Sequence, residues 1–238
     1  MPDLTDYPEQ IARDGYAIVE HAVSEAAVED LAQAIAALPQ SDAVRRKTNV
    51  YGIRNLIEEC EPVAELACAA AIRGLVEPVL GEDSFAVRAT FFDKVPDANW
   101  KLRWHQDSVI AVRERVETPG FTAWADKAGV QQVRPPAEIL QRMLAIRVHL
   151  DDCGADNGPL RVLAGSHRQA WPREELDRCK EQFEERTCLV GRGGVVAMRP
   201  LLLHASGPAI EPAHRRVVHL EFAAGELPGE LDWRTRCR

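Results

Sequence analysis

The sequence contains no stretch that approaches the ~18 consecutive apolar residues needed for a membrane-spanning helix. Its opening residues, MPDLTDYPEQ, lack the basic and apolar segments of a secretory signal, and its last residues, WRTRCR, are not a peroxisomal address. None of the six cysteines forms a C-x-x-C pair, and a chain of this length folds without disulfides. We therefore expect a cytoplasmic protein with reduced thiols and no membrane partner.

An excess of basic charge is also missing. The chain has 29 Lys and Arg against 37 Asp and Glu, which gives a net charge of −8. Because nucleic-acid binding depends on a basic surface, this balance argues against a nucleic-acid partner and leaves a small-molecule substrate as the expected one. The 238 residues, 46% of them hydrophobic, are enough for one domain over residues 1–238. The sequence does not indicate whether the protein is a monomer or an oligomer.

The N-terminal part, about residues 1–82, favours helices around one short strand over 15–23. Ser24 is a typical N-cap, and apolar residues at helical spacing follow it until Pro39. Residues 40–56 are polar and predict a loop. An Ala-rich helix is expected over 62–80, interrupted around Pro78 and Gly81.

From about residue 84 to 223 the pattern changes to short segments rich in Val, Ile, Leu and Phe between turn residues. They predict strands over 84–95, 101–112, 143–152, 158–165, 193–206 and 215–223. This pattern indicates a mainly β fold with flanking helices, of the jelly-roll or β-sandwich kind. Two long connections, 113–142 and a partly helical 168–192, are expected to be lids or binding loops.

His105 and Asp107 lie two residues apart in a predicted strand, so their side chains share one face. Such a pair can bind a metal, form an orienting hydrogen bond or form a buried ion pair. A third ligand is available in His204, on a late strand that would face the same interior. Two histidines and one carboxylate form the facial triad of non-haem Fe(II) oxygenases, which leaves coordination positions open.

Arg215 and Ser206 add a second feature near this triad. Ser206 follows His204 by two residues, and Arg215 begins the last predicted strand. A guanidinium and a hydroxyl that converge beside a metal can bind a carboxylate. A dicarboxylate that chelates iron at one end needs such a receptor at its other end.

These segments resemble the phytanoyl-CoA dioxygenase family of Fe(II)/2-oxoglutarate oxygenases. The resemblance rests on WHQD (104–107), DNGPLRVLAGSH (156–167) and HASGPAIEPAHRR (204–216), which occur in the family's order. It implies a double-stranded β-helix (jelly-roll, cupin-like) fold, Fe(II) on His105, Asp107 and His204, and O2 as oxidant. It also implies that 2-oxoglutarate binds through Arg215 and Ser206.

The resemblance further suggests that polar side chains on the strand before H-x-D hold the other end of the cosubstrate, here Arg88 and Lys94. Because related halogenases lack the aspartate of H-x-D, the intact Asp107 favours hydroxylation. The expected activity is therefore that of an Fe(II)/2-oxoglutarate-dependent dioxygenase. It would hydroxylate an unactivated C–H of a small metabolite or natural-product intermediate. A cupin-like metal- or ligand-binding module and a 2-oxoglutarate-independent dioxygenase remain alternatives.

Substrate contacts are predicted at Arg147, Trp124 and Arg54, and these arginines favour an anionic substrate. Arg147 interrupts a strand fit for a core, so it either reaches solvent or faces an anion. Trp124 and Arg54 are expected in loops that could close over a substrate. His149 and His219 are better explained as core or surface residues than as cavity residues.

Overall fold

The computed structural model describes residues 6–47 and 50–238. The first five residues of the opening segment, and residues 48–49 of the predicted 40–56 loop, lie outside the described residues. The helices and short 3₁₀ turns are α1 (Tyr7–Asp14), α2 (Glu25–Ala36), α3 (Leu56–Glu59), α4 (Glu61–Cys68), α5 (Ala70–Leu80), α6 (Ala137–Leu140), η1 (Ser166–Arg168), η2 (Arg173–Glu175) and α7 (Leu176–Gln182). Of the helices described, none combines the length and the hydropathy that a bilayer crossing requires.

The strands form three antiparallel sheets. They are β1 (Tyr16–Val19), β2 (Val44–Arg46), β3 (Val50–Ile53), β4 (Phe85–Asp93), β5 (Leu102–His105), β6 (Ile110–Val112), β7 (Thr122–Lys127), β8 (Val130–Arg134), β9 (Met143–His149), β10 (Leu160–Leu163), β11 (Glu185–Cys188), β12 (Val195–Met198), β13 (His204–Ser206) and β14 (Arg216–Ala223). The large sheet has the order β1-β12-β9-β14-β4-β3-β2, and the smaller ones β11-β10-β13-β5 and β6-β8-β7. The predicted mainly β, double-stranded β-helix fold is confirmed.

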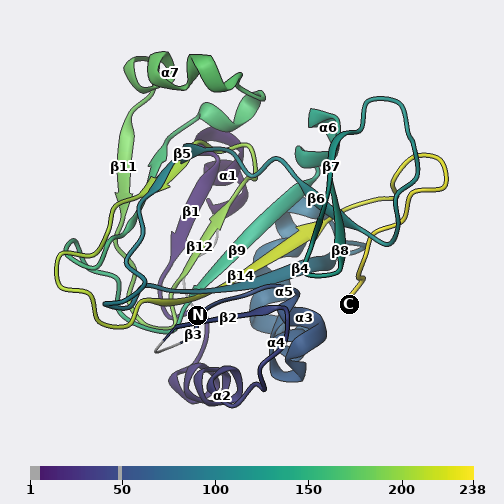
Figure 1. Cartoon of the computed structure of the whole chain (residues 1–238). Coiled ribbons are helices and arrows are strands. Elements are labelled where there is room, and N and C mark those ends of the chain that lie inside the picture. Colours follow the sequence, from purple (N-terminus) through teal and green to yellow (C-terminus); the bar gives the residue numbers. More distant parts are fainter. Residues whose placement is uncertain (1–5, 48–49) are drawn as a thin grey trace.

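The two faces of the large sheet differ in chemistry. Leu144, Ile146 and Val148 of β9 point outward into one core with α2, α3, α4 and α5, which cover this face (Figure 1). The alternate residues of β9 point inward, and they include Arg147 and His149. Alternation therefore places Leu144, Ile146 and Val148 under the helices and the polar Arg147 and His149 inside the barrel.

Several sequence expectations for the fold hold. Ser24 does cap α2, because its hydroxyl accepts a hydrogen bond from the backbone N–H of Ala27 at 3.3 Å. The helix ends at Ala36, before Pro39. The last predicted strand is β14, which pairs with both β4 and β9 at the centre of the large sheet.

Other expectations are wrong. The segment 40–56 contains the hairpin β2–β3, whose buried apolar side chains, Val44 and Ile53, are too few to give a strand signal. The helix predicted over 62–80 breaks at Ala69, and Pro78 lies inside α5, in its last turn, where it removes only one intrahelical hydrogen bond.

Two predicted single strands each divide between sheets. Residues 101–112 form β5 and β6, and residues 193–206 form β12 and β13. The connection 113–142 holds the hairpin β7–β8, so Trp124 lies in a strand and not in a loop. The connection 168–192 does contain helix α7, but its end forms strand β11.

Candidate metal centre

The three predicted metal ligands converge at one place. His105 is the last residue of β5 and His204 the first residue of β13, and the two residues face each other across the strand pair. Asp107 follows β5, with its backbone N–H bonded to the carbonyl of Pro200 at 2.9 Å. Nε2 of His105 and Nε2 of His204 lie 3.8 and 3.7 Å from the Asp107 carboxylate oxygens. The three ligand atoms lie within 4.8 Å of one another.

Backbone carbonyls orient both imidazoles. Nδ1 of His105 lies 2.8 Å from the carbonyl oxygen of Arg103, and Nδ1 of His204 lies 2.9 Å from that of Leu202. With Nδ1–H donated to a carbonyl, each ring presents the lone pair of Nε2 to the shared space. The side chain of Gln106 bonds to the backbone of Leu201 and Trp171, which fixes the turn between the first two ligands.

The charge state of the triad suits a divalent cation. Burial lowers the pKa of His204 to about 4, so this imidazole is neutral at pH 7. Burial alone would raise the pKa of the Asp107 carboxyl, but its electrostatic interactions with the surrounding histidines and Arg88 lower it well below its ordinary value. Neutral imidazoles and an ionised carboxylate are the protonation states that bind metal. A donor set of two imidazoles and one carboxylate fits Fe(II).

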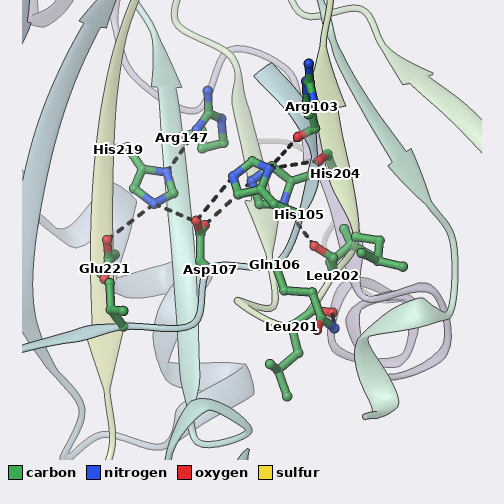
Figure 2. A network of polar contacts seen from close by, with 12 residues as sticks. Arg103, His105, Gln106, Asp107, Arg147, Leu201, Leu202, His204, His219 and Glu221 are labelled. Atoms are coloured by element: carbon green, nitrogen blue, oxygen red, sulfur yellow. Dashed lines mark hydrogen bonds and ion pairs between the residues drawn. The ribbon is translucent and has the colours of Figure 1, made fainter. Parts of the chain in front are cut away.

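Asp107 is supported from its other side by His219 of β14 (Figure 2). Nε2 of His219 lies 3.9 Å from Asp107 and 3.6 Å from Glu221. Glu221 is in turn ion-paired with Arg88 at 2.6 Å. The expectation that His219 belongs to the core or the surface is wrong, because it lines the cavity beside the triad.

This space is an inner cavity of about 270 Å³. It is lined by the triad and by side chains that include Arg54, Arg88, Thr90, Phe92, Trp100, Gln132, Arg147, Ser206, Arg215, His219 and Glu221. Arg147 therefore points from β9 into the cavity that holds the triad. Of the two predicted alternatives, solvent or a site that could hold an anion, the structure shows the second. Trp124 is not among the lining residues. It packs with the apolar cluster around β6 and β8.

One end of the site is strongly cationic. Lys94, Arg147 and Arg215 are all buried, each at most 7% exposed. Within residues 6–47 and 50–238, no carboxylate forms an ion pair with any of the three. Nε of Arg147 and Nε of Arg215 have no hydrogen-bond partner. Burying charge without a counter-ion is costly, so this arrangement fits an anionic ligand.

Ser206 belongs to the same cationic end. Its hydroxyl lies 3.1 Å from Nζ of Lys94, and Lys94 also bonds to the carbonyl of Gly207. Arg215 donates to the carbonyl of Gly158 at 2.7 Å. Burial, reinforced by the charge of Arg215, lowers the pKa of Lys94 to about 7. The hydroxyl and the two predicted cations therefore share one corner of the fold.

Arg88, predicted to bind the cosubstrate, and Arg54, predicted to contact the substrate, both line the inner cavity, but in different states. The guanidinium of Arg88 is already engaged by Glu221, with Nε donating at 2.8 Å. Arg54 is half-buried after β3. Sequence reasoning missed Glu221. The pattern His219-Leu220-Glu221 on a predicted strand was an available signal, because it puts two titratable residues on one face.

Solved structures with the same fold cover nearly the whole chain. AviO1 from Streptomyces viridochromogenes Tue57 is 21% identical, with a TM-score of 0.71 over 96% of this chain and 98% of that one. EctD from S. alaskensis, crystallised with bound Fe, is 20% identical, with a TM-score of 0.73 over 98% and 86%. SnoN, a non-haem α-ketoglutarate-dependent epimerase from nogalamycin biosynthesis, is 16% identical, with a TM-score of 0.69 over 94% and 84%.

No curated protein sequence matches the chain significantly. The sequence pattern of phytanoyl-CoA dioxygenase (PhyH), in contrast, matches residues 11–217. This match includes all three residues of the triad, Arg215 and Ser206, and it spans both the N-terminal helices and the barrel. The chain therefore belongs to the phytanoyl-CoA dioxygenase family of Fe(II)/2-oxoglutarate-dependent oxygenases.

Proposed function

We propose that this protein is a hydroxylase that uses Fe(II), 2-oxoglutarate and O2 to oxidise an unactivated C–H of a small, anionic metabolite or natural-product intermediate. The observation that carries the proposal is the pairing of two half-sites. A triad of two histidines and one carboxylate lies in the same barrel as a buried cluster of Lys94, Arg147 and Arg215 that has no carboxylate partner in the described residues. A dicarboxylate cosubstrate needs both halves.

The residues have separate roles in this proposal. His105, Asp107 and His204 hold the iron. Arg215 and Ser206 bind the distal carboxylate of 2-oxoglutarate, because a guanidinium and a hydroxyl can both donate to it.

Lys94 adds a positive charge beside Ser206, at 3.1 Å from its hydroxyl. Arg88, which is ion-paired with Glu221 on the cavity wall, contacts the other end of the cosubstrate. Arg147 and Arg54 contact the substrate, and Trp124 supports the nearby hairpin.

When bound, iron and 2-oxoglutarate together supply the oxidising chemistry that breaks the C–H bond. The chain itself orients the ligands through the carbonyls of Arg103 and Leu202. It keeps the coordination position of Asp107 filled by a carboxylate, which disfavours halide binding. Deep burial of His204, which is 2% exposed, excludes water from one side of the centre.

The test is a titration without oxygen. Fe(II) and then 2-oxoglutarate are added to the metal-free protein, and the visible difference spectrum is recorded. A weak charge-transfer band is expected only when both are present. Asp107→Ala should bind iron weakly, whereas Arg215→Gln should bind iron normally and need at least tenfold more 2-oxoglutarate for the same band.

Two outcomes would contradict the proposal. If iron does not bind, the histidines and Asp107 form only a structural cluster. If iron binds and no band follows, the protein is a 2-oxoglutarate-independent dioxygenase or a binding module. Once a substrate is found, ¹⁸O from O2 in the product distinguishes hydroxylation from epimerisation or ring closure, neither of which leaves that oxygen in the product.

A further inference from the structure

A second cavity opens beside the metal site, between the β2–β3 hairpin and the segment that follows β4. This outer cavity has a volume of about 600 Å³, which is in the range of small-molecule sites. Arg54, Thr90, Phe92 and Trp100 line both the inner and the outer cavity. A molecule with its reacting carbon at the metal centre can therefore extend into the outer cavity.

The outer cavity is basic although the whole chain carries a net charge of −8. Arg45, Lys47 and Arg54 line it, and Asp97 is the one acidic residue among its described lining. Lys47 donates to the backbone carbonyl of Asp97. In the part of the chain that the structure describes, no carboxylate forms an ion pair with any of the three cations. Such a local excess of positive charge attracts anions.

The electrostatic environment of Arg54 favours the binding of an anion. Partial burial lowers the pKa of its guanidinium, and the neighbouring charge of Arg45 lowers it further. Two like charges thus lie on the lining of the outer cavity. An anion between them would offset both the repulsion and the lost hydration.

An aromatic pair borders the same cavity. The rings of Tyr51 and Trp100 have centroids 6.2 Å apart at an interplanar angle of 60°, so they do not stack on each other's faces. Asn99 fixes this segment, because its amide bonds to both the N–H and the carbonyl of Ala209 at 2.7 and 2.8 Å. The pair is therefore preorganised to contact a ring-containing molecule.

We propose that the outer cavity binds the acidic end of the substrate, with a phosphate or carboxylate on Arg45, Lys47 and Arg54 and a ring-containing body against Tyr51 and Trp100. The assignment of this molecule as substrate rests on the proposed function, because only the metal centre makes it react. The binding site itself stands on the cavity, its charges and its rings. These five residues then determine specificity.

The experiment uses three matched probes: 1-naphthyl phosphate, 1-naphthoate and neutral 1-naphthol. Each is titrated calorimetrically into the full chain loaded with Fe(II) and saturating 2-oxoglutarate under argon, so that the cationic end of the inner cavity is occupied. Both anions should bind at least tenfold more tightly than naphthol. The order of the two anions tells whether the site prefers phosphate or carboxylate.

Variants locate the binding. Arg45→Gln and Arg54→Gln should each weaken both anions about tenfold and leave naphthol unchanged, whereas Trp100→Ala should weaken all three probes. The matched control is Arg186→Gln, an exposed arginine of β11 that pairs with Glu184. It should change nothing. Affinity for the anions should also fall with added salt.

The proposal is overturned if naphthol binds as tightly as the anions, if the arginine variants bind the anions like the wild type, or if no probe binds. Repeating the titration without metal separates the two proposals. If adding Fe(II) and 2-oxoglutarate gives no charge-transfer band but the anions still bind, the outer site is supported and the proposed function is contradicted. A band without anion binding contradicts the outer site alone.

Discussion

Nη1 of Arg147 lies 3.1 Å from Nδ1 of His219, between residues that face each other on β9 and β14. An arginine can only donate, so Nδ1 of His219 is the acceptor and the ring carries its proton on Nε2. That proton points at the carboxylates of Asp107 and Glu221, 3.9 and 3.6 Å away. The guanidinium thus sets the tautomer of the ring that supports the metal carboxylate.

We predict that Arg147→Met lowers the affinity for 2-oxoglutarate or substrate at least tenfold, because it removes a buried positive charge from the cavity. Iron affinity should change less than cosubstrate affinity. Arg147→Lys, which keeps a charge, should recover part of the loss. Arg161→Met, at a partly exposed ion pair with Glu185, is the control. Unchanged apparent affinities for both ligands would show that Arg147 serves only the fold.

Gly158 offers a test of the anion corner that does not alter a charge. Its backbone has φ +59°, and an added Cβ would lie 2.7 Å from the carbonyl of Gly207 and 3.1 Å from Nζ of Lys94. Gly158→Ala should therefore reduce stability and raise the KM for 2-oxoglutarate several-fold, since its carbonyl also accepts from Arg215. Gly154→Ala, where a Cβ would meet nothing within 4 Å, should change neither. Equal behaviour of the two variants would contradict this.

Variants of the ion pair between Arg88 and Glu221 can distinguish a structural role of Arg88 from a role in binding the cosubstrate. Arg88→Met deprives the buried carboxylate of Glu221 of its arginine partner, so the free energy of unfolding should fall by about 3–5 kcal/mol. Replacing Glu221 as well, in Arg88→Met/Glu221→Met, should restore most of it. Denaturant unfolding measures this, and 2-oxoglutarate affinity is measured on the stable double variant. If Arg88 contacts the cosubstrate as proposed, affinity stays low despite restored stability, and wild-type affinity would contradict the contact.

Much of the site could be predicted because its ligands follow local rules. His105, Asp107 and His204 were found from a two-residue spacing and a late strand, and the structure brings their ligand atoms within 4.8 Å. Arg147 could be placed only after the large sheet was known. Periodicity divides the residues of a strand into two sets, but packing against the helices decides which set faces outward.

The errors have a common physical cause. Residues 101–112 and 193–206 look like single strands because strand-favouring residues occur in both halves, yet each half pairs in a different sheet. Strand pairing is a long-range property that a hydrophobic pattern does not contain. For the same reason Trp124 was expected in a loop, although its segment pairs with β8 at the edge of the barrel.

We predict that Lys94 gives 2-oxoglutarate binding a pH dependence with a definite sign. Its pKa, lowered by burial and then by Arg215 to about 7, means that the ammonium is charged below pH 7 and largely neutral above it. If Lys94 borders the cosubstrate as proposed, the anionic 2-oxoglutarate should bind better to the charged form. Its affinity should therefore be highest near pH 6, fall between pH 7 and 8.5, and lose most of this dependence in Lys94→Met. Calorimetry in buffers of different ionisation enthalpy should detect proton uptake on binding at pH 7.5.

The free energy of unfolding of the protein without cosubstrate should change with pH in the opposite direction to the cosubstrate affinity. Between about pH 7 and 10.5 the unfolded chain keeps the Lys94 proton that the folded chain has lost. The free energy of unfolding therefore rises with pH in this window. Cosubstrate affinity and stability thus change with opposite signs as one ammonium loses its proton, and Lys94→Met should flatten both profiles. A general loss of structure at high pH would lower both together, so a parallel fall in the wild type would contradict a buried, titrating Lys94.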